Sequence, residues 1–194
     1  MRTFVALLVA VLFLSGCSRS DGQPSAEKTD QTDEPEKPET ASKKSAARVG
    51  QDRFVERMSK LGNRIVCPSR WNEVDKGDTW LLQVPDNQTT ITILSFTVAG
   101  TGSLAQFQEM VVGAVDKEGK LERSTWTAIK VGDVDATEMN LSDGVNSWRL
   151  VTLQSGACYH ALILECPKLI MDLNADFYEK VLCTFKGISE VRQK

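Results

Sequence analysis

Histidine is almost absent from this chain of 194 residues, since His160 is the only one. Any catalytic arrangement that depends on an imidazole, such as a Ser-His-Asp or Cys-His site, would therefore have to use that residue. The chain also has no Cys-x-x-Cys pair, and its charges are interspersed, with a net charge of −3 and no basic stripe. These absences argue against redox catalysis by paired thiols and against nucleic acid as a partner.

The longest apolar run is too short to cross a bilayer, which needs about 20 apolar residues. It occupies residues 4–14 and follows one basic residue, Arg2. A basic start, a short apolar segment and small residues after it are typical of a secretory signal. Residues 14–17, Leu-Ser-Gly-Cys, resemble the lipobox of bacterial lipoproteins. That resemblance implies that residues 1–16 are removed and that Cys17 becomes the lipidated first residue.

Lipidation would attach the mature chain to a membrane without a transmembrane helix, because two or three acyl chains make an effectively permanent anchor. In the lipoprotein family an aspartate after the lipidated cysteine is the usual signal for retention in the inner membrane. This chain has Ser18 there instead. The resemblance therefore implies an extracytoplasmic protein, on the outer membrane in a cell that has one.

Residues 17–49 are expected to be the lipidated cysteine and a disordered linker. Between residues 18 and 48 there is no Leu, Ile, Val, Met or aromatic residue. Such a segment cannot bury enough apolar surface to offset its ordering entropy. As a flexible coil of about 31 residues it would span roughly 30 Å on average.

Residues 50–194 have the length and the apolar content of one domain, including all four tryptophans of the chain. Apolar residues at helical spacing after Asp52 predict a helix over 54–61, which Gly62 would end. Alternating and β-branched runs then predict strands, and the turn residues from Pro85 onward predict that the last two form a hairpin. These strands are expected at 64–67, 71–74, 79–84 and 89–98.

The second half of the domain begins with a predicted capping box at Ser103 and Gln106, which opens a helix with one apolar stripe that ends by Gly119. A last helix is expected from about Asn174. Four further strands are expected between the helices, at 126–131, 134–141, 145–153 and 158–165. Short links and the absence of βαβ spacing predict an α+β fold, an antiparallel sheet with helices packed on it.

The order of these elements resembles the PsbP-type α-β-α sandwich. The likeness rests on the run Pro-Ser-Arg-Trp at 68–71, a mid-chain helix after Gly-Ser, consecutive antiparallel strands, and a terminal helix ending in Cys-Thr-Phe at 183–185. That fold serves a photosystem extrinsic protein, a Ran-binding nuclear import factor and several bacterial lipoproteins. Because these relatives bind different things, the resemblance implies a fold and no shared reaction.

The predicted strand from Cys158 onward places Cys158, His160 and Cys166 on one face. This is the pattern of a packed surface, and no nucleophile motif or metal-ligand spacing accompanies it, so we interpret His160 as structural. An exported chain with an even number of cysteines after the lipid anchor is expected to form disulfides. Since the last helix must run back along the strand, we predict a Cys158–Cys183 bond and, by elimination, a Cys67–Cys166 bond.

Two other patterns suggest binding sites. The turn at Gly100, Gly102 and Ser103 enters a helix and could offer backbone N–H groups to an anion, but it lacks the lysine and the length of a phosphate loop, so we interpret it as a turn followed by an N-cap. Four acidic residues could supply calcium ligands, but they lie along a strand and its turn and lack calcium-loop spacing, so we interpret them as a solvated acidic edge. They are Asp133, Asp135, Glu138 and Asp143.

The sequence favours a non-catalytic binding or scaffolding module that is tethered to a membrane and contacts an envelope protein or a small ligand, with no cofactor and no metal. One alternative is an enzyme that uses thiols or a metal in the region of Cys158, His160, Cys166 and Cys183. Another is a structural envelope protein in which the linker matters more than the domain.

The first prediction tests the anchor. Replacing the expected lipid acceptor, Cys17→Ala, should abolish labelling with radioactive fatty acid and leave the unprocessed precursor, because the acceptor thiol is gone. A variant that matures and stays on the membrane like the wild type would contradict the lipoprotein assignment.

Overall fold

The computed structural model describes residues 53–85 and 88–189, all within a compact unit that begins at Gln51. The expected signal at 1–16 and the linker at 17–49, which includes Cys17, lie outside the described residues. No helix in the described ranges is long and apolar enough to span a bilayer.

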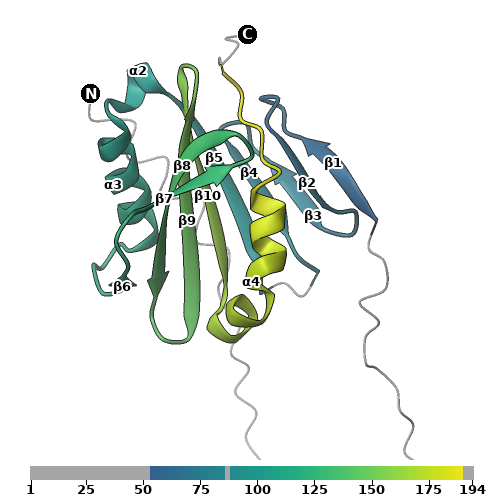
Figure 1. Cartoon of the computed structure of the whole chain (residues 1–194), viewed down its shortest axis with the longest axis vertical. Coiled ribbons are helices and arrows are strands. Elements are labelled where there is room, and N and C mark those ends of the chain that lie inside the picture. Colours follow the sequence, from purple (N-terminus) through teal and green to yellow (C-terminus); the bar gives the residue numbers. More distant parts are fainter. Residues whose placement is uncertain (1–52, 86–87, 190–194) are drawn as a thin grey trace, which may run out of the picture. The chain divides into compact units, whose positions relative to one another are not determined.

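An antiparallel sheet forms the centre of the unit, with strand order β3-β4-β5-β10-β9-β8-β6 and with β7 also paired to β8 (Figure 1). The hairpin of β4 and β5 and the four later strands are as the sequence predicted. The strands are β3 (Asn72–Asp75), β4 (Thr79–Gln83), β5 (Thr90–Thr97), β6 (Glu122–Arg123), β7 (Thr127–Val131), β8 (Val134–Ser142), β9 (Asn146–Ser155) and β10 (Cys158–Pro167).

A separate hairpin precedes this sheet, formed by β1 (Phe54–Met58) and β2 (Arg64–Pro68). The helix predicted over 54–61 is therefore wrong. In β1 the residues alternate between exposed and half-buried, and the strand pairs with β2 along its whole length. Arg57 donates hydrogen bonds to the carbonyls of Ser69 and Trp71 at 2.8 and 2.6 Å. These tertiary bonds outweigh the weak helical preference of a short segment.

Within the described residues three helices lie around the sheet: α2 (Val98–Thr101), α3 (Leu104–Val115) and α4 (Lys168–Leu182). The capping box of α3 is confirmed, with Ser103 and Gln106 bonded to each other's backbone. The start of α4 was predicted too late, because it begins at Lys168 and not near Asn174. Asn174 has non-helical backbone angles and kinks the helix, and its side-chain amide donates to the carbonyl of Ile170.

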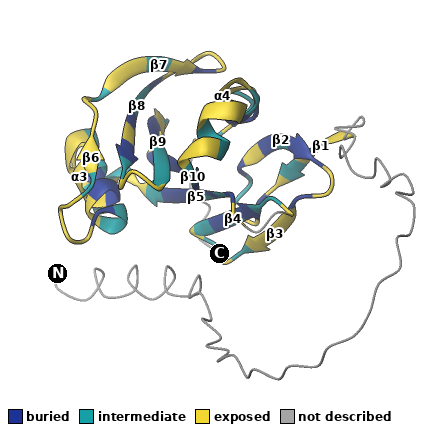
Figure 2. Ribbon diagram, turned by 90° about the horizontal axis from the view of Figure 1, so that it is seen from below, coloured by how far each residue is buried: buried dark blue, intermediate teal, exposed yellow. Residues whose placement is uncertain are grey.

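The helices α3 and α4 pack on opposite faces of the sheet, and buried residues concentrate in the strands between them (Figure 2). Leu162 and Leu164 of β10 belong to the core under α4, and Ala161 and Ile163 belong to the core under α3. The sandwich of helix, antiparallel sheet and helix confirms the predicted α+β class.

His160 is fully buried on the α4 face of β10, where it takes part in a closed ring of hydrogen bonds. Asn63 donates through Nδ2 to Ser95 Oγ at 2.8 Å, and Ser95 Oγ lies 2.9 Å from His160 Nδ1. His160 Nε2 lies 3.0 Å from the carbonyl of Ile188, whose N–H donates to Asn63 Oδ1 at 3.1 Å.

The direction of each bond in this ring is fixed by its neighbours. Because the Ile188 carbonyl can only accept, His160 Nε2 carries a proton and donates to it. In the neutral imidazole Nδ1 then accepts from the Ser95 hydroxyl, whose oxygen accepts from Asn63. Burial lowers the pKa of His160 below its ordinary value, although the Ile188 carbonyl acts in the opposite direction. The ring joins the ends of β2, β5 and β10 to the segment that follows α4, which indicates a structural role.

The ring predicts a specific dependence of stability on pH. Since the pKa of His160 is lower in the folded than in the unfolded chain, its contribution is complete above about pH 6.5 and is lost as the pH falls below that value. We expect the free energy of unfolding of the wild type to fall between pH 7 and pH 5, by at most about 1.4 kcal/mol per pH unit.

The matched control is the variant His160→Gln. It removes the only histidine of the chain, so no imidazole titrates in it. Glu165, whose pKa is raised by burial, is present in both proteins and contributes equally to each profile. The difference between the two unfolding profiles from chemical denaturation should therefore shrink toward pH 5. Parallel profiles over this range would contradict a neutral, buried His160.

Candidate functional site

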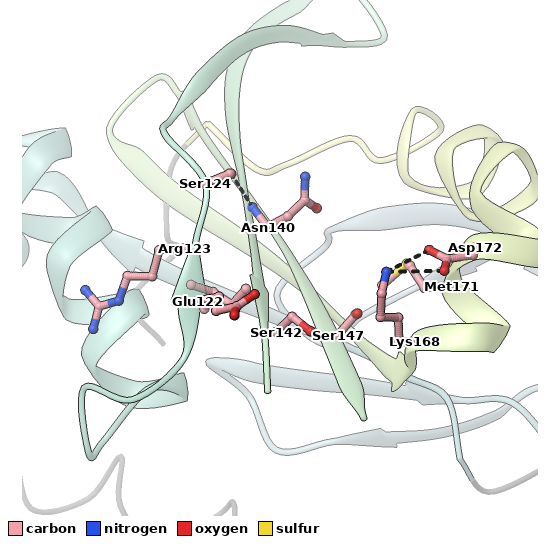
Figure 3. Close-up of a pocket in the computed structure, with 10 residues that line it drawn as sticks. Glu122, Arg123, Ser124, Asn140, Ser142, Ser147, Lys168, Met171 and Asp172 are labelled. Atoms are coloured by element: carbon pink, nitrogen blue, oxygen red, sulfur yellow. Dashed lines mark hydrogen bonds and ion pairs between the residues drawn. The ribbon is translucent and has the colours of Figure 1, made fainter. Parts of the chain in front are cut away.

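An open pocket of about 500 Å³ lies beside the first turn of α4, where that helix meets β6, β8 and β9 (Figure 3). Its lining is mostly polar and comes from segments distant in the sequence. The residues are Glu122, Arg123, Ser124, Asn140, Leu141, Ser142, Ser147, Lys168, Met171 and Asp172.

The polarity of the pocket follows from a change along one face of the sheet. On β9, Val151 and Leu153 contribute to the core under α4. Every second residue of β9 lies on this same face. Toward the β8–β9 turn, these positions are occupied by Arg149 and then by Ser147. The partner strand changes in the same way, since Asn140 pairs with Arg149 in the register. This corner is therefore built as a solvated surface and not as core.

Several polar groups in the pocket are already used. Ser142 Oγ accepts from the N–H of Gly144 at 3.0 Å and lies 3.1 Å from the carbonyl of Asn146, while Ser124 Oγ accepts from the N–H of Asn140 at 3.0 Å. In contrast, the side chains of Asn140, Ser147 and Glu122 make no hydrogen bond to any residue in the described ranges. They are available to a ligand as an amide, a hydroxyl and a carboxylate.

Charges of both signs stand at the edge of the pocket. Lys168 Nζ lies 3.2 Å from Asp172 Oδ2, one helical turn away, and both side chains are more than half exposed. Such an exposed pair is held weakly and can exchange its partner for a ligand. Arg123 points away from the pocket, and its Nε donates to Asp116 at 2.9 Å (Figure 3).

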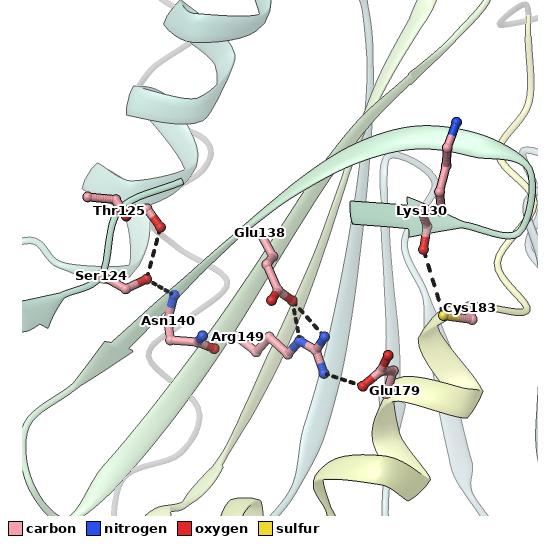
Figure 4. Close-up of polar contacts among 8 residues, drawn as sticks. All are labelled: Ser124, Thr125, Lys130, Glu138, Asn140, Arg149, Glu179 and Cys183. Carbon is pink, nitrogen blue, oxygen red and sulfur yellow. Dashed lines mark hydrogen bonds and ion pairs between the residues drawn. The ribbon is translucent and has the colours of Figure 1, made fainter. Parts of the chain in front are cut away.

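A second polar group lies next to the pocket on the same face of the sheet (Figure 4). Arg149 donates from Nε to Glu138 at 2.8 Å, its Nη2 lies 2.6 Å from the same carboxylate oxygen, and its Nη1 lies 3.9 Å from Glu179 of α4. Arg149 and Glu138 are only 15% and 20% exposed. Because removal of either Arg149 or Glu138 would leave the other as a poorly solvated charge, this pair is a structural link between β8 and β9.

The residues of the alternative thiol site are not assembled for chemistry. Both ring nitrogens of His160 are used in the hydrogen-bonded ring. Cys158 and Cys166 are 0% and 1% exposed, on the same strand as His160. Burial also raises the pKa of the Cys67 thiol, despite the opposing effect of a nearby arginine. A buried thiol with a raised pKa is poorly reactive.

The structure does not contain the two predicted disulfides, because Cys67, Cys158, Cys166 and Cys183 are all thiols in it. The last helix does run back along β10, and Phe185 just after it packs on His160 with ring centroids 5.5 Å apart. Cys183 itself faces β7, where its Sγ lies 3.8 Å from the carbonyl of Lys130 (Figure 4). In this position Cys183 contacts the β7 backbone and forms no bond with Cys158.

The other two sequence candidates are satisfied within the protein. At the candidate anion site, Gln106 Oε1 accepts from the N–H of Ser103 at 2.9 Å and fills the space above Gly102. Gly102 also donates its N–H to Val98, and Gly100 lies within the short helix α2, so few donors remain for an anion.

The acidic residues are used separately from one another. Asp135 pairs with Lys130 and Glu138 with Arg149. Asp143 closes its own turn by accepting from the N–H groups of Asn146 and Val145, and these bonds lower its pKa. Among the residues at 53–85 and 88–189, no three His, Cys, Asp or Glu side chains are grouped as metal ligands. Asp133 joins no such group.

Sequence reasoning missed the pocket itself. The signal that could have revealed it is the alternation along β9, in which Ser147 and Arg149 share a face with Val151 and Leu153. A face that changes from apolar to polar within one strand indicates that the covering helix ends or turns there.

Comparison with known proteins supports the fold and gives no information on the function. No protein-family model and no curated protein matches the sequence. Among solved structures, the cyanobacterial PsbP protein (CyanoP) of Synechocystis sp. PCC 6803 matches with a TM-score of 0.55 at 12% identity, over 74% of this chain and 98% of that one.

Two further structures match with lower TM-scores. LpqN, which is involved in cell envelope biogenesis of Mycobacterium tuberculosis, gives 0.44 at 12% identity, over 70% of this chain and 91% of that one. A Pseudomonas aeruginosa protein of unknown function gives 0.45 at 11% identity, over 70% and 97%. The match to CyanoP and the layers formed by α3, the sheet and α4 show that the folded part of this chain is a PsbP-like α+β domain.

Proposed function

We propose that this chain is a lipid-anchored, non-catalytic binding or scaffolding module of the bacterial envelope, and that the pocket beside α4 is where it holds its ligand or partner. The observation that carries this proposal is the set of solvent-accessible polar groups in the pocket that bond to no described residue. Asn140, Ser147 and Glu122 gain no hydrogen bond from the described residues, so a bound molecule can pair with them without displacing a protein contact.

The localisation in this proposal is inferred from the first residues of the chain. The lipobox resemblance at 14–17 provides a lipid anchor, and Ser18 favours the outer membrane over the inner one. The apolar-poor linker lets the domain reach ligands at some distance from the bilayer, roughly 30 Å on average.

The chemistry of the pocket favours a polar partner. Hydroxyl, amide, carboxylate and ammonium groups face it together, and Met171 is the one fully apolar side chain besides Leu141 in its lining. Such a mixture suits a small polar ligand or a polypeptide surface that carries both donors and acceptors. It does not suit nucleic acid, because binding of phosphates requires a concentration of basic residues.

The enzyme alternative is less well supported by the same geometry. His160 uses both of its ring nitrogens in structural hydrogen bonds, and the adjacent cysteines on β10 are inaccessible to a substrate. A purely structural envelope protein would need no such pocket, so the pocket favours binding over that alternative as well.

The experiment is photo-crosslinking in the native cell, with a benzophenone amino acid in place of Ser147. We expect one discrete adduct, a protein or a ligand of defined mass, because this side chain lies in the lining of the pocket. The matched position is Glu109, which is exposed on α3 at the other face of the sheet. It should give no such adduct.

A second substitution tests whether the adduct depends on the pocket. Filling it with Asn140→Trp should reduce the yield at position 147 by about tenfold, which corresponds to about 1.4 kcal/mol of binding free energy. Glu109→Trp should leave the yield unchanged. Equal adducts at positions 147 and 109, or an adduct that persists in the filled pocket, would overturn the proposed site.

A further inference from the structure

Three large aliphatic side chains are strongly exposed next to the pocket. Val145, Leu169 and Leu173 are 71%, 69% and 73% exposed. The N–H of Lys168 donates to the carbonyl of Val145 at 2.8 Å, which brings the β8–β9 turn against the start of α4. Leu169 and Leu173 are one turn apart on the same side of the helix. We call these three residues the aliphatic patch.

The kink at Asn174 explains why α4 exposes these leucines. In the second half of the helix, Tyr178, Val181 and Leu182 are buried against the sheet. In the first half, Ile170 and Met171 reach the core but are only partly buried. The first half of α4 therefore serves as a surface more than as a cover of the core, and a cluster of exposed aliphatic residues on such a surface marks an interaction site.

The attachment of the linker indicates what covers the patch. The folded unit begins with β1, and Phe54 at its start packs edge-to-face on Phe177 of α4, with ring centroids 6.2 Å apart. The described part of the chain therefore begins beside the second half of the helix whose first half carries the patch. In the proposed function, a flexible coil of the length expected for residues 17–49 would have an average span of roughly 30 Å from the anchored lipid.

We infer that the aliphatic patch docks on the lipid bilayer in which Cys17 is anchored. The inference rests on the lipid anchor of the proposed function. A short flexible tether gives an effective concentration in the mM range, so even a small apolar surface is enough to engage the membrane. Docking in this way places the pocket, whose edge includes Lys168 and Asp172, next to the lipid headgroups.

The charges around the patch define the kind of docking. Lys168 stands beside Asp172 and near Asp143, so the surroundings carry both signs and no excess of positive charge. The driving force is therefore burial of aliphatic side chains and not attraction to anionic lipids. Docking should occur on zwitterionic phosphatidylcholine and persist at high salt.

The test uses the full mature chain, purified from the membranes of the cells that export it, in phosphatidylcholine vesicles whose acyl chains carry a quencher. A fluorophore is attached at Leu169→Cys or at Leu173→Cys, in a Cys183→Ser background because Cys183 is the one partly exposed thiol among the cysteines of the described domain. The matched control is Met110→Cys on α3, an exposed apolar position on the opposite face of the sheet.

We expect the emission at positions 169 and 173 to fall by about half or more, since docked side chains enter the boundary of headgroups and acyl chains. The control at 110 should keep its emission. Replacing both leucines, Leu169→Asp with Leu173→Asp, should abolish quenching of a label at Val145→Cys. Both positions are mostly exposed, so the fold should be retained, which circular dichroism checks.

Flotation of the same vesicles separates the inference from the proposal on which it rests. If the chain does not float with the vesicles, the lipid anchor is wrong. If it floats but positions 169 and 110 are quenched equally, only the docking is wrong. Self-quenching at 169 that rises with protein density, without quenching by lipid, would assign the patch to a second copy of the chain and overturn bilayer docking.

Discussion

The burial of β10 on both faces is the constraint on which the rest of this domain depends. Its alternate residues enter two separate cores, one under α3 and one under α4. A strand of this kind requires a helix on each side of the sheet, which produces the three-layer arrangement. It also requires a partner for every polar group it carries, and His160 meets this requirement through Asn63, Ser95 and Ile188. The ring in turn ties the segment after α4 to the sheet.

The proposed functional surface lies where the core under α4 no longer covers the sheet. The core under α4 extends along β9 as far as Val151, and beyond it the same face carries Arg149 and Ser147. The kink at Asn174 separates the half of α4 that packs on the core from the half that exposes Leu169 and Leu173. The polar pocket and the aliphatic patch therefore have one structural cause, which is incomplete coverage of the sheet by α4 at the β8–β9 turn.

Much of the fold follows from local sequence pattern. The strands β4, β5 and β7 to β10 have clear alternation or β-branched runs, and the capping box at Ser103 marks the start of α3, whereas the two-residue strand β6 was not predicted. At residues 54–58 the apolar spacing predicts a helix, but the segment forms a strand because it pairs with β2. Asn174 has the chemistry of a helix N-cap, and it sits at a kink within α4 instead.

The sites were harder to predict, because they depend on relations between elements. The pocket requires the register that sets Asn140 opposite Arg149 and the position at which α4 crosses the sheet. The pairing of the cysteines also depends on such relations, since the side on which α4 places Cys183, here beside Lys130 of β7, has no local signal in the sequence. Burial could be inferred from alternation for His160, but its two hydrogen-bond partners, Ser95 and Ile188, come from distant segments that no local pattern connects.

We propose that the corner formed by the β8–β9 turn and the first half of α4 is the functional surface of this domain. This can be tested by hydrogen exchange of the full chain in its native membrane, compared with the same chain in detergent. If this corner engages the membrane or a partner, exchange at residues 143–149 and 168–173 is slower in the membrane, and exchange in α3 is unchanged. Slower exchange confined to α3, or the same exchange everywhere in both preparations, would rule out this surface.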